Sequence, residues 1–206
     1  NKNSGDVQIL EPIKGRECGT QHTNKLCQET FANNAQQIKK WNRDYGQLEA
    51  LHIRKGEPVI CTKNYWDKEL QNGSLGKVLE VYDEPKEQFD EDNSPIGCAY
   101  ADIEWDDGVI RPLSEDMVDN VTLAYSITIH KAQGSQWETI IIPIYPSRNM
   151  DRSMLYTAMT RATKKVIFIG NLEIAKGIVK EKPKASNRIT GLLDFLNEGY
   201  QESVPI

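Results

Sequence analysis

The feature that most constrains the fold is a run of mostly β-branched residues at 139–144, followed by a helical pattern and a second apolar run. A short, nearly continuous apolar run predicts a strand buried on both faces of a sheet. Residues 151–162 place apolar side chains at helical spacing, with Asp151 as a typical helix cap. Residues 165–169 predict another buried strand, closed by Gly170. Strands that alternate with helices predict an α/β fold with a parallel sheet.

The start of the chain fits the same sheet. Residues 7–10 predict a short buried strand, because an apolar run is ended by Pro12. Residues 20–41 hold neither proline nor glycine and predict helices, which end near residues 44–46. Residues 122–126 predict the strand at which the alternation of strands and helices resumes. Both ends of the chain are therefore expected to form one α/β domain.

The middle of the chain predicts short strands instead, at residues 57–62, 76–82 and 98–105. An Asn-Gly turn, an Asp-Gly turn and an acidic, proline-containing loop at residues 84–95 connect them. This spacing suggests a small β-barrel. We therefore expect an α/β domain of residues 1–53 and 120–206, interrupted by a barrel of residues 54–119.

The net charge of −5 argues, for the whole chain, against a nucleic-acid binder, but the charges are segregated. Residues 83–119 hold 13 acidic and 2 basic side chains, whereas residues 121–180 hold 8 basic and 3 acidic ones. The basic segment is compatible with a face that meets phosphates, and also with an ordinary solvated surface.

No apolar run approaches the roughly 18 residues of a membrane helix, so we expect no membrane partner. The four cysteines form no C-x-x-C pair, which argues against zinc and a disulfide framework and favours a cytoplasmic location. The chain begins at Asn1 rather than Met, and we expect this start to lie inside a longer protein. The sequence contains no G-x-x-x-x-G-K-[ST], G-x-G-x-x-G or G-x-S-x-G motif, so it does not predict a complete enzyme.

Two polar stretches stand out on either side of the run at 139–144. Residues 124–138 read A-Y-S-I-T-I-H-K-A-Q-G-S-Q-W-E, and residues 155–162 read L-Y-T-A-M-T-R-A. Together they closely resemble motifs V and VI of superfamily 1 DNA helicases, in the version of RecD-like helicases such as the exodeoxyribonuclease V alpha subunit. Weaker similarity to the same family covers most of the remaining chain, at residues 8–12, Gly19, Thr20, Asn24, 56–59 and 72–78. The resemblance implies a discontinuous RecA-like parallel-sheet lobe with an inserted SH3-like β-barrel.

The resemblance also implies roles for single residues. Single-stranded DNA is expected at Thr128, His130, Lys131 and Ser135, and ATP at Gln133, Gly134, Gln136 and Arg161. Arg161 is expected to be catalytic, as the arginine finger that reaches the γ-phosphate. Such a finger is typically worth about 10³–10⁵ in rate. No metal ligand is expected on this chain.

The residues themselves support these roles and leave alternatives open. Hydroxyl, imidazole and amide donors after a buried strand suit phosphate and sugar contacts that do not read sequence. An ordinary polar turn, with His130 capping it, is the alternative. Arg161, placed late in a helix, has the alternative of stabilising the helix dipole.

Two positions depart from the family pattern, and three aromatic residues are ambiguous. Gln136 stands where the family usually has Glu, and an uncharged amide binds a ribose hydroxyl more weakly. Ser74 replaces the usual Asp of the Asn-Gly-Asp turn. The barrel aromatics fill its core or stack on bases; they are Tyr65, Trp66 and Trp105.

The resemblance implies the C-terminal part of an ATP-dependent DNA helicase of DNA repair or recombination, moving 5′-to-3′ on single-stranded DNA. Its partners would be Mg-ATP, the DNA strand, an N-terminal motor lobe that holds the phosphate loop and the Mg²⁺ ligands, and subunits of a nuclease complex. The alternative is a non-catalytic nucleic-acid-binding module derived from such a lobe. Arg161 favours the enzyme, because a pure binder needs no arginine finger. The sequence leaves DNA and RNA open as the strand.

Overall fold

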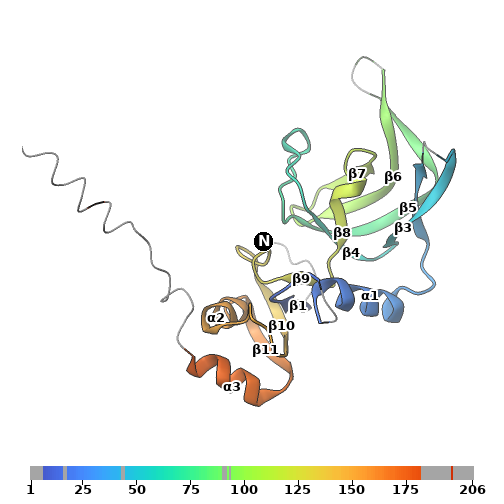
Figure 1. Ribbon diagram of the computed structural model, residues 1–206. Helices are drawn as coiled ribbons and strands as arrows, with labels where there is room; N and C mark the ends of the chain where they lie inside the picture. Colours follow the sequence, from blue (N-terminus) through green and yellow to red (C-terminus); the bar gives the residue numbers. More distant parts are fainter. Residues whose placement is uncertain are drawn as a thin grey trace, which may run out of the picture.

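The computed structural model describes residues 7–15, 18–42, 45–89, 92, 94–181 and 196. Its strands form one parallel sheet that carries the helices and one antiparallel part that lies beside it (Figure 1). Among the helices of the described residues, none is long and apolar enough to cross a membrane.

The parallel sheet contains four strands in the order β9-β1-β10-β11, and all three neighbouring pairs are parallel. Its strands come from both ends of the described chain, which confirms the predicted α/β class with a parallel sheet. The elements of this parallel unit are β1 (Val7–Glu11), α1 (Thr20–Phe31), β9 (Ser126–Thr128), β10 (Trp137–Ile144), α2 (Arg152–Met159), β11 (Ala162–Gly170) and α3 (Leu172–Lys180).

Helices α2 and α3 bury one face of this sheet. Ile140, Ile142 and Ile144 of β10 lie in one apolar cluster with residues of both helices. The alternate residues of β10 are only half-buried, so the prediction of burial on both faces is wrong for this strand. It is also wrong for β11, which is an edge strand and leaves Phe168 39% and Ile169 55% exposed.

The capping prediction for α2 is confirmed. The Asp151 carboxylate accepts a hydrogen bond from the backbone N–H of Met154 at 2.8 Å. The helix ends at Met159, with Thr160 as its C-cap. Arg161 therefore lies just beyond the helix, in the connection to β11, and not within its last turn as predicted.

The antiparallel part contains a five-stranded sheet in the order β7-β6-β5-β4-β8 and a separate hairpin of β2 and β3. Strands β7 and β8 are the two edges of the larger sheet, so the predicted SH3-like barrel stays a prediction. The elements of this antiparallel unit are β2 (Gln37–Asn42), β3 (Gln47–Arg54), β4 (Pro58–Cys61), β5 (Leu75–Phe89), β6 (Pro95–Trp105), β7 (Ile110–Ser114) and β8 (Val121–Leu123), with two short 3₁₀ turns at Trp66–Lys68 and Val118–Asn120.

The helical prediction for residues 20–41 is wrong in its second half. Helix α1 ends at Phe31, and β2 begins at Gln37. Asn33 and Asn34 lie between them, and asparagine favours turns because its side chain bonds nearby backbone groups. Ile38 is then fully buried in the core of the antiparallel unit, so long-range packing selects a strand there.

Two further predictions fail because strand pairing extends or divides the expected segments. The acidic loop at residues 84–95 instead continues β5 to Phe89, with a register irregularity between Val81 and Lys86 that accommodates Pro85. The single strand at residues 122–126 is two strands, since β8 pairs with β4 and β9 pairs with β1.

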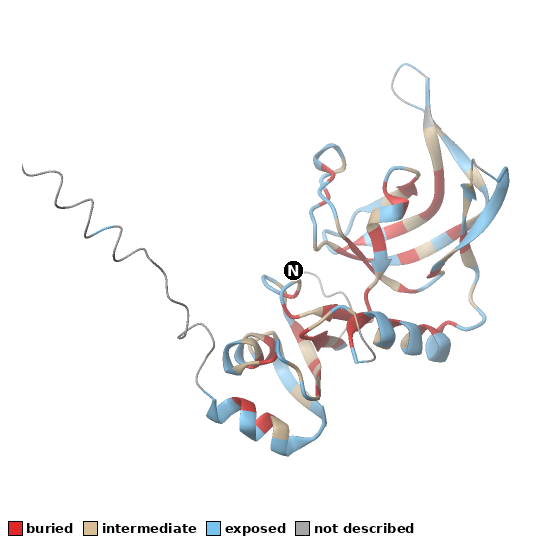
Figure 2. Ribbon diagram, viewed as in Figure 1, coloured by how far each residue is buried: buried red, intermediate tan, exposed pale blue. Residues whose placement is uncertain are grey.

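The two units share part of their apolar interior. Ile60 and Leu75 of the antiparallel unit belong to the cluster that lies under α2 and α3. Figure 2 shows buried residues continuing from the parallel sheet into the strands beside it. Ile38 and Ile53 pack in the cluster of the antiparallel unit, which argues for grouping the hairpin with that unit. The predicted division at residues 54 and 119 stays a prediction.

Candidate functional site

The turn after β9 is built by short-range hydrogen bonds. The carbonyl of Thr128 accepts from the backbone N–H of Ala132 at 3.1 Å, and its hydroxyl accepts from the N–H of Lys131 at 3.4 Å. Gly134 has a φ of +90°, a conformation that glycine adopts without strain. We call residues 128–136 the motif turn.

The motif turn leads from one end of the parallel sheet to the other. Thr128 lies level with Glu11, at the carboxyl end of β1 and β9. The turn ends at Gln136, and Trp137 begins β10. Thr128 therefore lies near the carboxyl ends of the strands, and Gln136 lies near their amino ends. A strand-end site can account for Thr128 only, because Gln136 precedes its strand.

The residues predicted to contact DNA differ in exposure. His130 is exposed, whereas Thr128, Lys131 and Ser135 are half-buried. Burial lowers the pKa of the Lys131 ammonium, and the neighbouring Lys14 charge lowers it further. A bound phosphate would offset both effects, because an anion favours the charged form of lysine.

Arg161 contacts the far end of the motif turn. Its Nη1 donates to the backbone carbonyl of Ser135 at 3.4 Å, and its Nη2 donates to the Thr160 hydroxyl at 3.4 Å. The Arg161 carbonyl accepts from the N–H of Trp137 at 2.9 Å. The structure thus brings together Arg161 and Ser135, which lie 26 residues apart in the sequence.

The guanidinium of Arg161 is not saturated by these contacts. Its Nε is buried and has no hydrogen-bond partner, and both Nη contacts are long. Arginine carries five N–H donors, and a buried donor left unpaired costs about 1–3 kcal/mol. An anion beside Arg161 would supply the missing acceptors.

The other residues predicted at the nucleotide lie beside this contact without joining it. Gln133, Gly134 and Gln136 are exposed. Among the hydrogen bonds of the described residues, none connects these three to Arg161. The motif turn is bonded to the Arg161 side chain through the carbonyl of Ser135 instead.

The three aromatic residues left ambiguous by the sequence have different environments. Tyr65 and Trp105 are 6% and 2% exposed and belong to the core of the antiparallel unit. Trp66 is 72% exposed on a 3₁₀ turn. Within the described ranges, no group of three His, Cys, Asp or Glu side chains is arranged to hold a metal ion.

Two buried carboxyl groups escaped the sequence analysis. Glu11 ends β1 and is fully buried; one of its oxygens accepts from the hydroxyls of Thr23 and Ser126, and the other has no partner. Glu57 is equally buried between the two units. Burial raises the pKa of both groups. The only sequence signal for either is a charged residue at the border of an apolar run.

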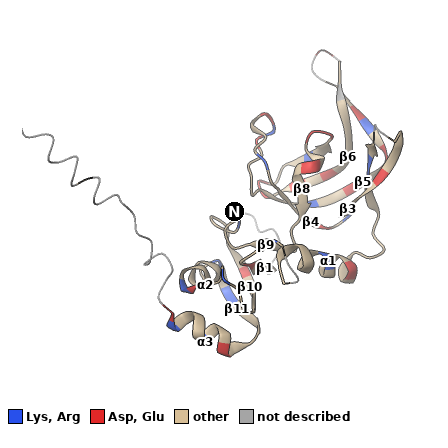
Figure 3. Cartoon of the chain, viewed as in Figure 1, with Lys and Arg blue, Asp and Glu red and all other residues tan. Residues whose placement is uncertain are grey.

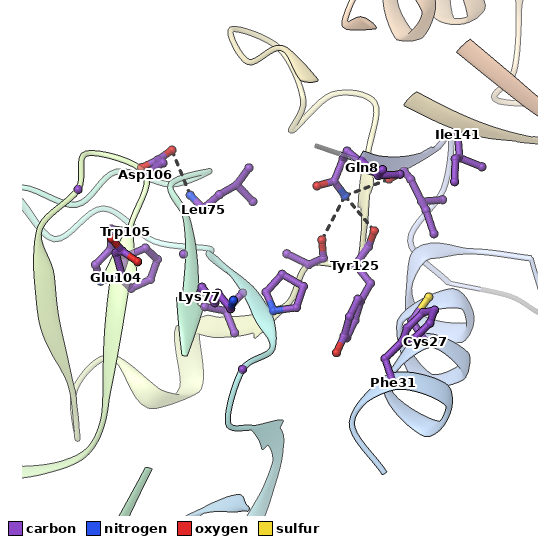
Figure 4. Close-up of a pocket in the computed structure, with 18 residues that line it drawn as sticks. Gln8, Cys27, Phe31, Leu75, Lys77, Glu104, Trp105, Asp106, Tyr125 and Ile141 are labelled. Atoms are coloured by element: carbon purple, nitrogen blue, oxygen red, sulfur yellow. Dashed lines mark hydrogen bonds between the residues drawn. The ribbon is translucent and has the colours of Figure 1, made fainter. Parts of the chain in front are cut away.

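A cavity of about 690 Å³ lies between the two units (Figure 4). Its walls include Cys27 and Phe31 from α1, Tyr125 from the β8–β9 connection, and Lys77 and Trp105 from the antiparallel sheet. The rings of Phe31 and Tyr125 lie 6.3 Å apart. The cavity lies beside the amino ends of β1 and β9, and none of its lining residues belongs to the motif turn.

The acidic and the basic segments of the sequence lie on different units of the fold. The acidic segment at residues 83–119 falls on β5, β6, β7 and their connections, in the antiparallel unit. The basic segment at residues 121–180 falls almost entirely on the parallel unit, where Lys and Arg colour the ends of α2, α3 and part of β11 (Figure 3).

Comparison with known proteins gives three informative similarities. Residues 123–169 match the UvrD-like helicase C-terminal domain. The chain is 27% identical to the ATP-dependent RecD2 DNA helicase of Deinococcus radiodurans. That alignment covers 92% of this chain and 23% of the helicase. It is 29% identical to the RecBCD enzyme subunit RecD of Mycobacterium tuberculosis, in an alignment that covers 72% of this chain and 25% of that subunit. The chain therefore spans about a quarter of the length of these relatives.

A solved structure supports the fold. The crystal structure of Pif1 helicase from Bacteroides in complex with ADP-AlF3 and ssDNA superposes with a TM-score of 0.53 at 18% identity. The superposition covers 98% of this chain and 47% of that one. The chain thus has a helicase-like fold, and its similarity to RecD and Pif1 helicases is consistent with the C-terminal lobe of a RecD-like superfamily 1 helicase.

Proposed function

We propose that this chain is the C-terminal part of an ATP-dependent DNA helicase that translocates on single-stranded DNA, 5′-to-3′. It would supply an arginine finger and DNA-backbone contacts, and an N-terminal lobe would complete the ATP site. The proposal includes the SH3-like class of the antiparallel unit, a cytoplasmic location and a role in DNA repair or recombination. One relative is named as a RecBCD subunit, which makes a nuclease complex one setting for the parent protein.

The contact between Arg161 and Ser135 carries the proposal. It joins the two motifs on which the helicase resemblance rests, and it leaves the buried Nε of Arg161 without an acceptor. A γ-phosphate at this position would accept hydrogen bonds from the unpaired N–H groups of Arg161. Charge that develops on the phosphate during hydrolysis would then be stabilised by a donor already in place.

The motif turn would divide its work between its two ends. Thr128, His130 and Lys131 would hold the DNA backbone near the carboxyl end of β9. Gln133, Gly134 and Gln136 would face the nucleotide together with Arg161. Ser135 is predicted from the sequence to contact DNA, and its backbone carbonyl accepts a hydrogen bond from Arg161. Ser135 would therefore couple the two ends of the motif turn. Movement of this turn between the ATP-bound and ATP-free states would move the DNA strand through the protein.

The Mg²⁺ that accompanies ATP would neutralise phosphate charge and be held by the N-terminal lobe. Arg161 fits a role at the outer phosphate, because its Nε–H is unpaired and its side chain bonds a carbonyl and a hydroxyl but no carboxylate in the described residues. The Bacteroides Pif1 structure is described as a complex with ADP-AlF3 and ssDNA, and this supports the proposed pair of ligands.

The test compares two variants of the parent protein that contains this chain and its N-terminal lobe. Arg161→Ala should leave ATP and DNA binding nearly intact and reduce the rate of hydrolysis by about 10³ or more, since a finger acts on the transition state. His130→Ala should reduce DNA-stimulated hydrolysis while basal hydrolysis changes little, because only a backbone contact is lost.

Thermal melting of both variants serves as the control. If hydrolysis and melting temperature fall together, Arg161 and His130 have structural roles only. If Arg161→Ala hydrolyses ATP as fast as the unmodified protein, the proposed arginine finger is wrong.

A further inference from the structure

Helix α1 buries a polar stripe instead of an apolar one. Its buried residues are Thr20, Asn24 and Gln28, spaced one turn apart, and none is more than 9% exposed. Leu26 and Phe31 of the same helix are 49% and 74% exposed. A helix that packs against a sheet usually buries its apolar side chains. This face of α1 is therefore arranged to bond polar groups of the chain beneath it.

Asn24 bonds the backbone of β9 and of Leu123, the last residue of β8. Its Oδ1 accepts from the N–H of Ser126 at 2.8 Å, and its Nδ2 donates to the carbonyls of Ser126 and Leu123, each at 3.0 Å. Strand β9 is the edge of the parallel sheet, and it pairs with β1 on its other side. The Asn24 amide thus takes the place of a neighbouring strand for Ser126.

Ser126 lies two residues before Thr128, where the motif turn begins. The Ser126 side chain is also held, because its hydroxyl donates to the Glu11 carboxylate at 3.2 Å. Both the backbone and the side chain of Ser126 are fixed from the parallel unit. The position of Thr128 and His130 therefore depends on a strand whose free edge is closed by one amide.

Gln28 has a different set of partners one turn further along α1. Its Nε2 donates to both carboxylate oxygens of Glu57, at 2.8 and 3.0 Å, and to the carbonyl of His52 at 3.2 Å. His52 belongs to β3 and Glu57 to the connection between β3 and β4, both in the antiparallel unit. Gln28 is as buried as Asn24 and makes as many bonds, but none of them is to β9. It is a matched control.

We propose that Asn24 is a positioning residue for nucleic-acid binding, which sets the place of the motif turn by bonding the free edge of β9. The inference rests on the proposed contact between this turn and single-stranded DNA. Loss of the amide would leave the buried Ser126 N–H and two carbonyls without partners, and β9 would shift or fray to reach water.

The experiment compares Asn24→Leu with Gln28→Met in the 206-residue chain. Three quantities are measured: the melting temperature, the amide hydrogen exchange of residues 126–130, and the affinity for a fluorescent oligothymidylate at low salt. Both variants should melt at lower temperature. Only Asn24→Leu should speed exchange at residues 126–130 and weaken DNA binding, by about tenfold for the loss of one to two net hydrogen bonds.

Asn24→Asp gives a second, graded test. Its carboxylate can still accept from the Ser126 N–H, but it faces two carbonyls without a proton to donate. Affinity relative to the unmodified chain should therefore recover as the pH falls toward the ordinary aspartate pKa of about 3.9.

The outcomes separate the two proposals. Unchanged exchange at residues 126–130 in Asn24→Leu overturns the positioning role, whatever happens to DNA binding. Equal loss of DNA affinity in Gln28→Met also overturns it, because general destabilisation then explains the effect. An unmodified chain that binds no oligothymidylate counts against the proposed DNA contact, while the exchange measurement still decides whether Asn24 holds β9.

Discussion

Two buried glutamates show how the surroundings of a single residue decide its effect on stability. The Glu57 carboxylate accepts bonds from Gln28, from the N–H of Arg54 and from the Tyr125 hydroxyl, so both of its oxygens face donors. One oxygen of Glu11 faces none. Burial raises the pKa of both groups, but only Glu57 has donors that match a carboxylate at each oxygen.

We predict that Glu11→Gln stabilises the chain at neutral pH by about 1 kcal/mol. A raised pKa means that Glu11 contributes its full stability below its ordinary pKa of 4.5 and loses it as the pH rises through the folded-state value. Glutamine does not titrate, so its advantage should vanish below that pH. Denaturant unfolding at several pH values measures this difference.

Glu57→Gln is the control for this prediction. Its amide nitrogen would face the Gln28 N–H together with either the Arg54 N–H or the Tyr125 hydroxyl, so at least one bond accepted by the carboxylate would be lost. This variant should therefore be less stable than the unmodified chain by about 1–3 kcal/mol. A gain in stability from Glu57→Gln, or a pH-independent effect of Glu11→Gln, would contradict the assignment of the two environments.

Among the elements, the junction between β11 and α3 leaves no room for a side chain at Gly170. Gly170 has a φ of +123°, and a Cβ placed there would lie 2.2 Å from the carbonyl oxygen of Ile144. Gly177, inside α3, has no atom within 4 Å of the same position. The two glycines therefore offer opposite predictions within ten residues of chain.

Gly170→Ala should destabilise the chain by about 2–3 kcal/mol, because backbone strain adds to the clash with Ile144. Gly177→Ala should stabilise it by about 0.5–1 kcal/mol, because alanine favours a helix interior. Unfolding followed by circular dichroism measures both. Equal stability of the two variants would mean that the β11–α3 junction relaxes freely, contrary to its tight approach to β10.

At the scale of the whole molecule, a net charge of −5 is divided between an acidic antiparallel unit and a more basic parallel unit. We predict that the 206-residue chain alone hydrolyses no ATP above background, since a second lobe is needed to complete the proposed site. Its affinity for single-stranded DNA should be weak and fall with salt, with a slope of about one to three at roughly 0.7 per neutralised phosphate.

Fluorescence anisotropy over a salt series measures this slope, and Lys131→Ala should lower it by about 0.7, the share of one phosphate. Tight binding that salt does not weaken would instead favour the non-catalytic binding module, with stacking on the exposed Trp66 as its source. ATP turnover by the chain alone, abolished by Arg161→Ala, would exclude the need for a second lobe.

The sequence by itself determined the features that depend on neighbouring residues. The apolar runs of β1 and β10 and the cap at Asp151 follow from local periodicity and side-chain chemistry, and the structure contains all three. The alternation of strands and helices was enough to indicate a parallel sheet. The two polar motifs were sufficient to indicate the helicase family, because they are short, contiguous and specific.

Only the tertiary structure decided which segments meet. Residues 37–42 became a strand because Ile38 fills the core of the antiparallel unit, and residues 121–128 became two strands because they pair with different sheets. Three hydrogen bonds join residues 26 to 115 positions apart: Arg161 to Ser135, Ser126 to Glu11, and Asn24 to Ser126. Local periodicity carries no information about such partners, since packing and hydrogen bonding select them only when the chain is folded.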